Sequence, residues 1–287
     1  MLRRFHLEEP ASIKETSELL GRFGESAKIY AGGTELLLAM KEGLVQYERL
    51  INVKGVQGLN EVDNGNGAIK IGALCTHRQL ENCPALLQKL PALVELEHNV
   101  ANVRVREVGT IGGNLCFAEP HADPGILLVA LDAKMVAEKA SGKREIAAEK
   151  FFVDAYETSL EPDELLTVIE VPLPAANSAA AYLKFGYLER PSVGVAVALK
   201  LNPAEKSLVD IRIGVGCAGP APKRVPAAEE MLRGKSIEEA TREVAKAGGV
   251  AGREAEAISD LHGSQEYKEH IVGVLLKRAL HGALSQC

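Results

Sequence analysis

The sequence has no apolar run long enough to cross a membrane. A membrane-spanning helix needs about 20 predominantly apolar residues, and no segment of these 287 residues approaches that length. The segment 1–10 starts with basic residues but lacks the apolar core of a signal peptide. We therefore expect a cytoplasmic protein without a membrane span.

Cysteines are few, odd in number and widely spaced. No C-x-x-C pair occurs among them (Cys75, Cys83, Cys116, Cys217 and Cys287). This spacing argues against a disulfide framework and against a zinc or iron–sulfur site within the chain. We expect no metal ligands here and buried or free thiols, although Cys116 is close enough to a glycine segment to approach a ligand.

Basic clusters are also lacking. The formal net charge is −6 at pH 7, and the Lys and Arg residues are dispersed, so we expect no nucleic-acid partner. The hydrophobic content of 46% supports a substantial core. A chain of this length suits two or three subdomains.

What the sequence does contain is two glycine-centred segments, Ile29–Leu36 and Gly109–Asn114, each with adjacent glycines and a threonine. Glycines tolerate positive φ and allow backbone N–H groups to converge on an anion, while a hydroxyl adds a further donor. In the first segment we expect a strand, a glycine turn and a helix capped by Thr34, an arrangement suited to phosphate. Both segments are candidate diphosphate sites, although such pairs also occur in ordinary turns.

Better-known nucleotide motifs do not explain the sequence. No lysine follows a glycine at the spacing of a P-loop. Gly214–Gly219 matches G-x-G-x-x-G after a strand-like run, but Pro220 and Pro222 follow it. Prolines cannot supply backbone donors to a pyrophosphate, so we interpret this match as a strand end and a turn.

Hydrophobic periodicity predicts an α+β protein in three parts, over residues 1–55, 56–175 and 176–287. In the first part we expect strands over 3–7, 27–30 and 49–53 and helices over 12–23 and 34–42. In the second we expect a strand over 68–73, a capped helix from Thr76, helices over 84–99 and 124–131, and shorter strands to Pro174. In the third we expect strands over 179–187, 194–201 and 208–215 and helices over 236–247 and 270–283, forming an antiparallel sheet with packed helices.

Four polar residues each allow two interpretations. Asp123 either caps the helix that follows it or accepts hydrogen bonds from sugar hydroxyls. Glu35 is favoured by a helix N-terminus, but a diphosphate would repel it unless it binds hydroxyls. His121 is more readily a surface or capping residue than a metal ligand, and Lys184 is more readily solvated than buried.

In the order and spacing of its motifs, the chain resembles the FAD-binding medium subunit of the xanthine dehydrogenase and aerobic carbon monoxide dehydrogenase family of molybdenum hydroxylases. The resemblance spans nearly the whole chain and rests on Ala31–Leu36, Thr110–Asn114, Ala122–Pro124, Leu128–Asp132, Glu170–Pro172, Lys184-Phe185, Gly263–Tyr267 and Leu275–Leu280. It departs from the family in having Arg190-Pro-Ser192-Val193 where Arg-x-x-Asp is common. A cysteine-bearing loop that some members insert is also lacking.

The resemblance implies two α+β subdomains clasping FAD, in the manner of the vanillyl-alcohol-oxidase superfamily, and a C-terminal sheet-and-helix domain. It implies that two segments hold the pyrophosphate, that Asp123 binds adenosine-side hydroxyls, and that three further residues line the site. The residues of the two segments are Ile29, Tyr30, Ala31, Gly32, Gly33, Thr34, Glu35 and Leu36, then Thr110, Ile111, Gly112, Gly113 and Asn114; the three lining residues are Val100, Leu166 and Lys184.

The resemblance also implies an electron relay. Electrons would pass from a large molybdenum-pterin subunit, through two [2Fe–2S] clusters of a small subunit, to FAD here and then to an external acceptor, in a dimer of heterotrimers. The protein would supply positioning and electrostatics, and no residue of this chain would be catalytic. A free-standing flavoenzyme and an assembly protein without cofactor are the alternatives. The sequence names neither the substrate nor the acceptor.

Overall fold

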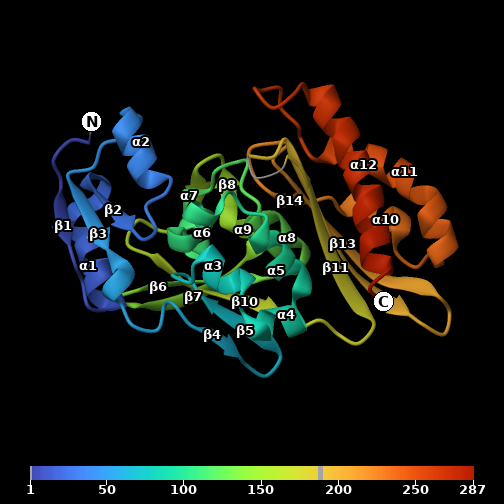
Figure 1. Cartoon of the computed structure of the whole chain (residues 1–287), viewed down its shortest axis with the longest axis horizontal. Helices are drawn as coiled ribbons and strands as arrows, with labels where there is room; N and C mark the ends of the chain where they lie inside the picture. The colour runs from blue at the N-terminus through green and yellow to red at the C-terminus, as the bar shows by residue number, and fades with distance from the viewer. Residues whose placement is uncertain (1, 187–189) are drawn as a thin grey trace.

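The first sheet is parallel and lies at one end of the molecule (Figure 1). In a computed structural model that describes residues 2–186 and 190–287, this sheet has the order β1-β3-β2. Its strands are β1 (His6–Glu8), β3 (Arg49–Asn52) and β2 (Ala27–Tyr30). Helix α1 (Ile13–Phe23) begins where the Ser12 side chain accepts a hydrogen bond from the Glu15 amide, as the sequence predicts.

Helix α2 (Leu36–Glu42) follows the first glycine segment. It ends at Gly43, whose φ of 80° lies in the left-handed region that favours glycine. Its start differs from the prediction, because Glu35 occupies the N-cap position and no side chain caps the helix. Thr34 therefore lies in the loop before the helix and is not its cap.

The second sheet is antiparallel, in the order β4-β5-β10-β6-β7. Its strands are β4 (Val62–Asn64), β5 (Ala68–Gly72), β10 (Leu165–Pro172), β6 (Lys134–Lys139) and β7 (Gly142–Ala147). A short helix, α9 (Ala148–Phe151), leads from β7 to a hairpin of β8 (Phe152–Asp154) and β9 (Glu157–Thr158). Central strands β5 and β10 pair from Gly72 with Val168 to Ala68 with Pro172.

Six further helices belong to this second part. They are α3 (His77–Glu81), α4 (Pro84–Lys89), α5 (Pro91–His98), α6 (Val103–Val108), α7 (Ile111–Phe117) and α8 (Pro124–Ala130). The capping box predicted for Thr76 and Gln79 is present at α3. Helix α7 was not predicted; the adjacent glycines suggested only a loop, but Thr110 caps a helix there and Ile111 and Leu115 are buried beneath it.

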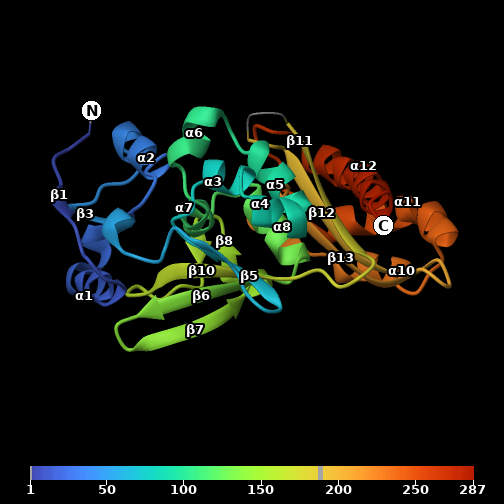
Figure 2. The same cartoon turned by 60° about the horizontal axis from the view of Figure 1, so that its bottom comes forward.

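The third sheet is antiparallel and has both faces covered (Figure 2). It consists of β11 (Ser178–Phe185), β12 (Val193–Asn202), β13 (Ser207–Gly216) and β14 (Lys223–Arg224), with helices α10 (Pro226–Leu232), α11 (Ile237–Glu254) and α12 (Gln265–Leu284). On β12, Val195 and Val197 join the core beneath α11 and α12, whereas Ala196 joins the core around α8. Alternate residues of β12 thus point to opposite faces of the third sheet. The last residue of the strand predicted over 179–187 lies outside the described residues.

Every residue of α8 is buried, because the helix lies between the second and third sheets. Two glycines of the G-x-G-x-x-G match make this packing possible. A Cβ at Gly214 would lie 2.3 Å from the Ile126 carbonyl oxygen, and one at Gly216 would lie 2.6 Å from the Ile126 side chain. The match is therefore a strand end, as expected, and the structure adds that it packs against a helix. The α+β class is confirmed.

Candidate functional site

A cavity of about 900 Å³ opens between the first two parts of the chain. One wall comes from residues of 20–53, the other from residues of 59–123 and 156–166, and Arg190 and Pro191 of the third part complete the lining. The volume is at the upper end of the range for small-molecule and cofactor sites. The cavity can therefore accommodate a large ligand.

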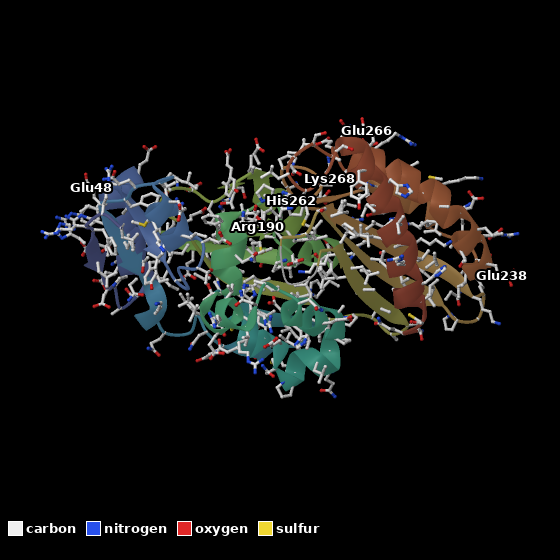
Figure 3. The ribbon with its side chains drawn as sticks, turned by 45° about the horizontal axis from the view of Figure 1, so that its top comes forward. Glu48, Arg190, Glu238, His262, Glu266 and Lys268 are labelled. Atoms are coloured by element: carbon white, nitrogen blue, oxygen red, sulfur yellow. The ribbon has the colours of Figure 1, made fainter. Side chains whose placement is uncertain are left out.

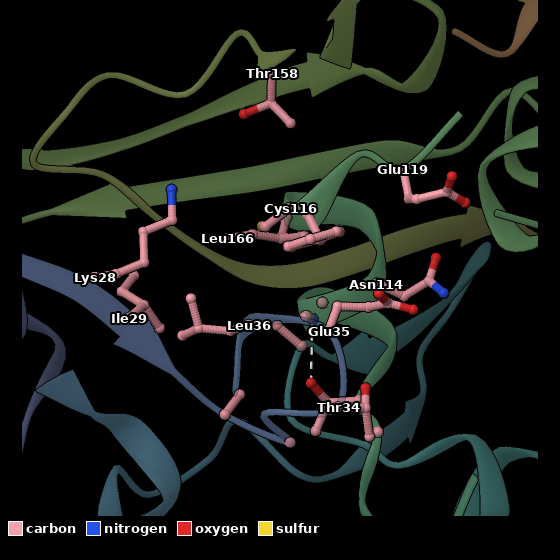
Figure 4. A pocket seen from close by; sticks show the side chains of 18 of the residues that line it. Lys28, Ile29, Thr34, Glu35, Leu36, Asn114, Cys116, Glu119, Thr158 and Leu166 are labelled. Carbon is pink, nitrogen blue, oxygen red and sulfur yellow. Dashed lines mark hydrogen bonds between the residues drawn. The ribbon is translucent and has the colours of Figure 1, made fainter. Parts of the chain in front are cut away.

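Most of the residues predicted from the sequence line this cavity. They are Ile29, Ala31, Gly32, Gly33, Thr34, Glu35, Leu36, Val100, Thr110, Gly112, Gly113, Asn114, Asp123 and Leu166. Figure 4 shows Thr34, Glu35, Asn114 and Leu166 among them. Segments separated by more than 130 residues in sequence thus meet around one space.

Tyr30, Ile111 and Lys184 are not part of the cavity lining. Successive side chains of a strand point to opposite faces, so Tyr30 turns away from the cavity while its neighbours face it. Its hydroxyl accepts a hydrogen bond from the Lys54 ammonium at 3.2 Å. Ile111 is fully buried in the core.

The first glycine segment is shaped by two different requirements. Gly33 has a φ of 75°, which other residues rarely adopt. Gly32 instead allows close packing, since a Cβ there would lie 2.3 Å from the Val108 carbonyl oxygen. The first segment thus rests directly on the start of the second. Within the described residues, the amides of Gly32, Gly33, Thr34 and Glu35 donate to no recorded protein acceptor.

The backbone amides of the second segment donate to acceptors within the protein. The prediction that they converge on a ligand is therefore not met. The Gly112 amide donates to the Ala73 carbonyl at 2.9 Å, and the Gly113 amide donates to Thr110 Oγ1 at 3.1 Å. The second segment instead contributes the side chains of Thr110 and Asn114 to the cavity. The Thr110 hydroxyl keeps its proton to donate, and the Asn114 Oδ1 atom is buried with no hydrogen-bond partner in the described chain.

These features fit a ligand with phosphate and hydroxyl groups. Free loop amides suit phosphate oxygens, and the unpartnered Asn114 oxygen calls for a donor because a buried acceptor without one is costly. A Cβ at Gly113 would meet only the Thr110 hydroxyl, at 2.8 Å, so the absence of a side chain there leaves the space open. The geometry accommodates a dinucleotide such as FAD.

An ion network crosses the cavity rim. Arg190 Nη2 lies 2.9 Å from Glu35 Oε2, and Arg190 Nη1 lies 3.4 Å from Glu119 Oε1. Burial raises the pKa of Glu119, although Arg190 opposes this shift. The positive charge of Arg190 offsets the negative charge of Glu35, which lies next to the loop with the free amides. Nothing in the sequence pointed to this pairing.

Asp123 has both carboxylate oxygens occupied. Its Oδ1 accepts a hydrogen bond from the Tyr182 hydroxyl at 2.5 Å, and its Oδ2 accepts one from the Lys184 ammonium at 2.9 Å. Although Asp123 is at the N-cap of α8, its side chain makes no capping bond. Burial raises the pKa of Asp123 against the opposing charge of Lys184. Lys184 is buried, so its expected solvation is wrong.

His121 connects the cavity to the C-terminal part. Its Nδ1 donates to the Pro191 carbonyl at 2.7 Å, and its Nε2 lies 3.2 Å from Asp260 Oδ2. The same Asp260 oxygen accepts a hydrogen bond at 2.6 Å from Lys268, whose side chain is fully buried. Figure 3 labels Lys268 and also His262, whose ring centroid lies 4.2 Å from that of His121. His121 is therefore neither a surface residue nor a helix cap.

Other lining residues escaped the sequence analysis, among them Lys28 and His77. Cys116 lines the cavity near Lys28 and Leu166 (Figure 4), and burial raises the pKa of its thiol to about 12. Lys28 could have been inferred from its place one residue before Ile29. His77 lies between the two residues of the Thr76–Gln79 capping box, and that pattern indicated only a helix start. In the described part of the chain, no group of three or more potential metal ligands occurs, and no helix is both long and apolar enough to cross a membrane.

The fold and cavity define a cofactor-binding α+β protein, and comparison with known proteins identifies its class. Residues 3–174 match the family model described as the FAD binding domain in molybdopterin dehydrogenase. Residues 190–283 match the CO dehydrogenase flavoprotein C-terminal domain. Together the two models cover most of the chain.

Similar proteins agree with these matches along their whole length. The chain is 32% identical over 285 residues to the carbon monoxide dehydrogenase medium chain of Hydrogenophaga pseudoflava, covering 99% of this chain and 98% of that one. It is 32% identical to the nicotine 6-hydroxylase medium subunit of Paenarthrobacter nicotinovorans, covering 94% of each. A solved structure of the Hydrogenophaga pseudoflava carbon monoxide dehydrogenase lacking the Mo-pyranopterin moiety matches with a TM-score of 0.95 and 33% identity, covering 100% of this chain and 99% of that one.

The chain belongs to the family of FAD-binding medium subunits of molybdenum hydroxylases, which confirms the resemblance seen in the sequence. Its cofactor is FAD, and its fold is the α+β FAD-binding fold of that family.

Proposed function

We propose that this chain is the electron-relay subunit of a molybdenum hydroxylase complex. Electrons would arrive from two [2Fe–2S] clusters on a small partner subunit, after substrate oxidation at a large molybdenum-pterin subunit, and would leave for an external acceptor. FAD, when bound, supplies the redox chemistry. We further propose a cytoplasmic location and a dimer of heterotrimers.

The observation that carries the proposal is the meeting of the two glycine segments at one cavity. The free amides of Gly32–Glu35 would bind the diphosphate, with the Thr110 hydroxyl as a further donor. Asn114 Oδ1 would accept a hydrogen bond from a cofactor hydroxyl. The other predicted lining residues would shape the walls, while Tyr30, Ile111 and Lys184 would act only from behind them.

The chain's own residues would hold FAD and set its surroundings without catalysing a step. Arg190 and Glu119 would place charge at the rim, and Leu166 and Val100 would exclude water from the walls. We retain the division into parts 1–55, 56–175 and 176–287, because the three larger sheets span residues 6–52, 62–172 and 178–224.

Reconstitution tests this function. The purified chain should bind FAD without a covalent bond, since no histidine or cysteine stands in either glycine segment. Heat denaturation should release FAD and not FMN, as mass spectrometry would show. The chain with FAD and a dye acceptor should oxidise no aldehyde, N-heterocycle or carbon monoxide until the large and small subunits are added. Steady turnover by the chain alone would refute the relay.

A further inference from the structure

A buried histidine–glutamate pair lies behind the cavity. His77 is the first residue of α3, and its Nδ1 lies 2.5 Å from Oε2 of Glu97, near the end of α5. The side chains are 3% and 0% exposed. Such burial means that each group depends on the other for its polar contact.

His77 itself also lines the cavity. Its backbone amide donates to the Gly109 carbonyl at 3.0 Å. A Cβ built at Gly109 would lie 3.3 Å from His77 Cδ2 and 3.7 Å from the Thr34 methyl. The edge of the imidazole ring that carries Cδ2 and Nε2 therefore lies close to the loop with the free amides.

The contact with Glu97 determines which ring nitrogen can serve a ligand. A carboxylate accepts hydrogen bonds, so Nδ1 carries the proton that it donates to Glu97. In the tautomer with its single ring proton on Nδ1, the ring presents Nε2 as an acceptor. No protein partner for Nε2 is recorded in the described chain.

We propose that His77 is a cofactor-binding residue whose Nε2 accepts a hydrogen bond from a sugar hydroxyl of FAD, with Glu97 as the positioning residue that fixes the ring. FAD has such hydroxyls on both sides of its diphosphate, in the ribityl chain and in the ribose. The inference rests on the proposed location of FAD in this cavity.

A purely structural pair would have the same geometry, so the test must separate the two roles. Glu97 Oε1 is buried without a partner in the described chain, and removal of His77 alone would strand a buried carboxylate and destabilise the fold. Paired substitutions avoid this problem. His77→Leu with Glu97→Leu removes both polar groups, whereas His77→Gln with Glu97→Gln keeps an amide near the position of Nε2.

The experiment measures FAD affinity of the apoprotein by quenching of flavin fluorescence, after urea unfolding has shown that each variant is folded. We expect the leucine pair to weaken FAD binding roughly tenfold, because the hydrogen bond to Nε2 is lost and the FAD hydroxyl is left desolvated without an acceptor. The glutamine pair should stay within roughly threefold of the unchanged protein. His98→Leu, at an exposed histidine that pairs with Glu81, should change nothing.

Equal affinities for the leucine and glutamine pairs would overturn the proposal, because the polar group facing the cavity would then be irrelevant. If the leucine pair does not fold, His77→Gln and His77→Asn, each combined with Glu97→Gln, provide the same comparison, since the shorter amide of asparagine cannot reach the position of Nε2. Competition by ADP and FMN then locates the hydroxyl. Loss for FMN alone places it in the ribityl chain, loss for ADP alone places it in the ribose, and equal loss for both indicates a phosphate contact and refutes the hydroxyl assignment.

Failure of this proposal and failure of the cavity assignment are distinguishable. Gly33→Val tests the cavity independently of His77, because it changes the amide-bearing loop at a φ of 75°. If Gly33→Val abolishes FAD binding while the leucine pair binds normally, the cavity assignment stands and the role of His77 does not.

Discussion

The ammonium group of Lys184 lies 2.9 Å from Oδ2 of Asp123, and each side chain is only 7% exposed. Lys184 also donates to the Asn99 carbonyl at 2.8 Å. A strand of the third sheet is thereby joined to the segment before α8 and to the residue after α5. This ion pair supports the cavity wall from behind, because Asp123 faces the cavity and Lys184 does not.

Lys184→Met should lower the free energy of unfolding of the apoprotein by about 3 kcal/mol, because removal of one partner leaves the Asp123 carboxylate buried and uncompensated. Urea unfolding followed by circular dichroism measures this change. Lys134→Met is the matched control, since Lys134 forms an exposed pair with Glu145 and surface pairs contribute little. Equal unfolding midpoints for the two variants would show that the buried pair adds no stability.

Gly113→Val should weaken FAD binding by more than about tenfold and leave the fold intact. The new side chain would enter the cavity, because Thr110 Oγ1 is the only neighbour of a Cβ there. Gly113 lies in α7 and its φ is not positive, so steric exclusion of the ligand, not backbone strain, is the cause.

Gly21→Val is its control. Gly21 also lies in a helix, α1, and a Cβ there meets nothing within 4 Å. The two variants therefore share the cost of placing a β-branched residue in a helix. They differ in access to the cavity and in the contact with Thr110 Oγ1, which only the Gly113 variant makes. Full flavin occupancy in purified Gly113→Val would remove the second segment from the FAD site.

Alkylation of Cys116 should be slow at neutral pH and slower still with FAD bound. The thiolate is the reactive form, and burial raises the pKa of this thiol to about 12. Below that pH, the rate of reaction with iodoacetamide should rise about tenfold per pH unit. Peptide mass spectrometry should find exposed Cys287 labelled first.

Protection by FAD is the informative part of this measurement. Cys116 lines the cavity and Cys287 does not, so saturating FAD should slow labelling of Cys116 alone. Labelling of Cys116 at the same rate with and without FAD would place the cofactor elsewhere.

Local features of the fold could be predicted from the sequence, because they depend on residues close together in the chain. Strand β2 has the predicted bounds, Gly43 ends α2, and the Thr76 capping box is present. The apolar run from Pro124 was correctly predicted as a buried helix. In each case the signal is hydrophobic periodicity or a capping residue.

Long-range contacts account for the rest. The need for glycine at position 32 comes from the Val108 carbonyl, 76 positions further along the chain, and not from a ligand. The ion pair between Arg190 and Glu35 and the burial of Lys184 likewise depend on how separate parts pack. Both glycine segments could be located from the sequence. Only the structure shows that the first segment has free amides, whereas the second contributes side chains to the cavity.

The burial of α8 bears on how this protein could be divided. Two family models meet between residues 174 and 190, which suggests a convenient place to cut. Yet Ile126 packs directly on Gly214 and Gly216, and Tyr182 joins the same core from the far side of the cut. A fragment ending at residue 174 would expose one side of its central apolar helix to water. The two family models thus divide the sequence at a point where the hydrophobic core is continuous. Any transfer of the FAD-binding part to another protein would have to include the third sheet.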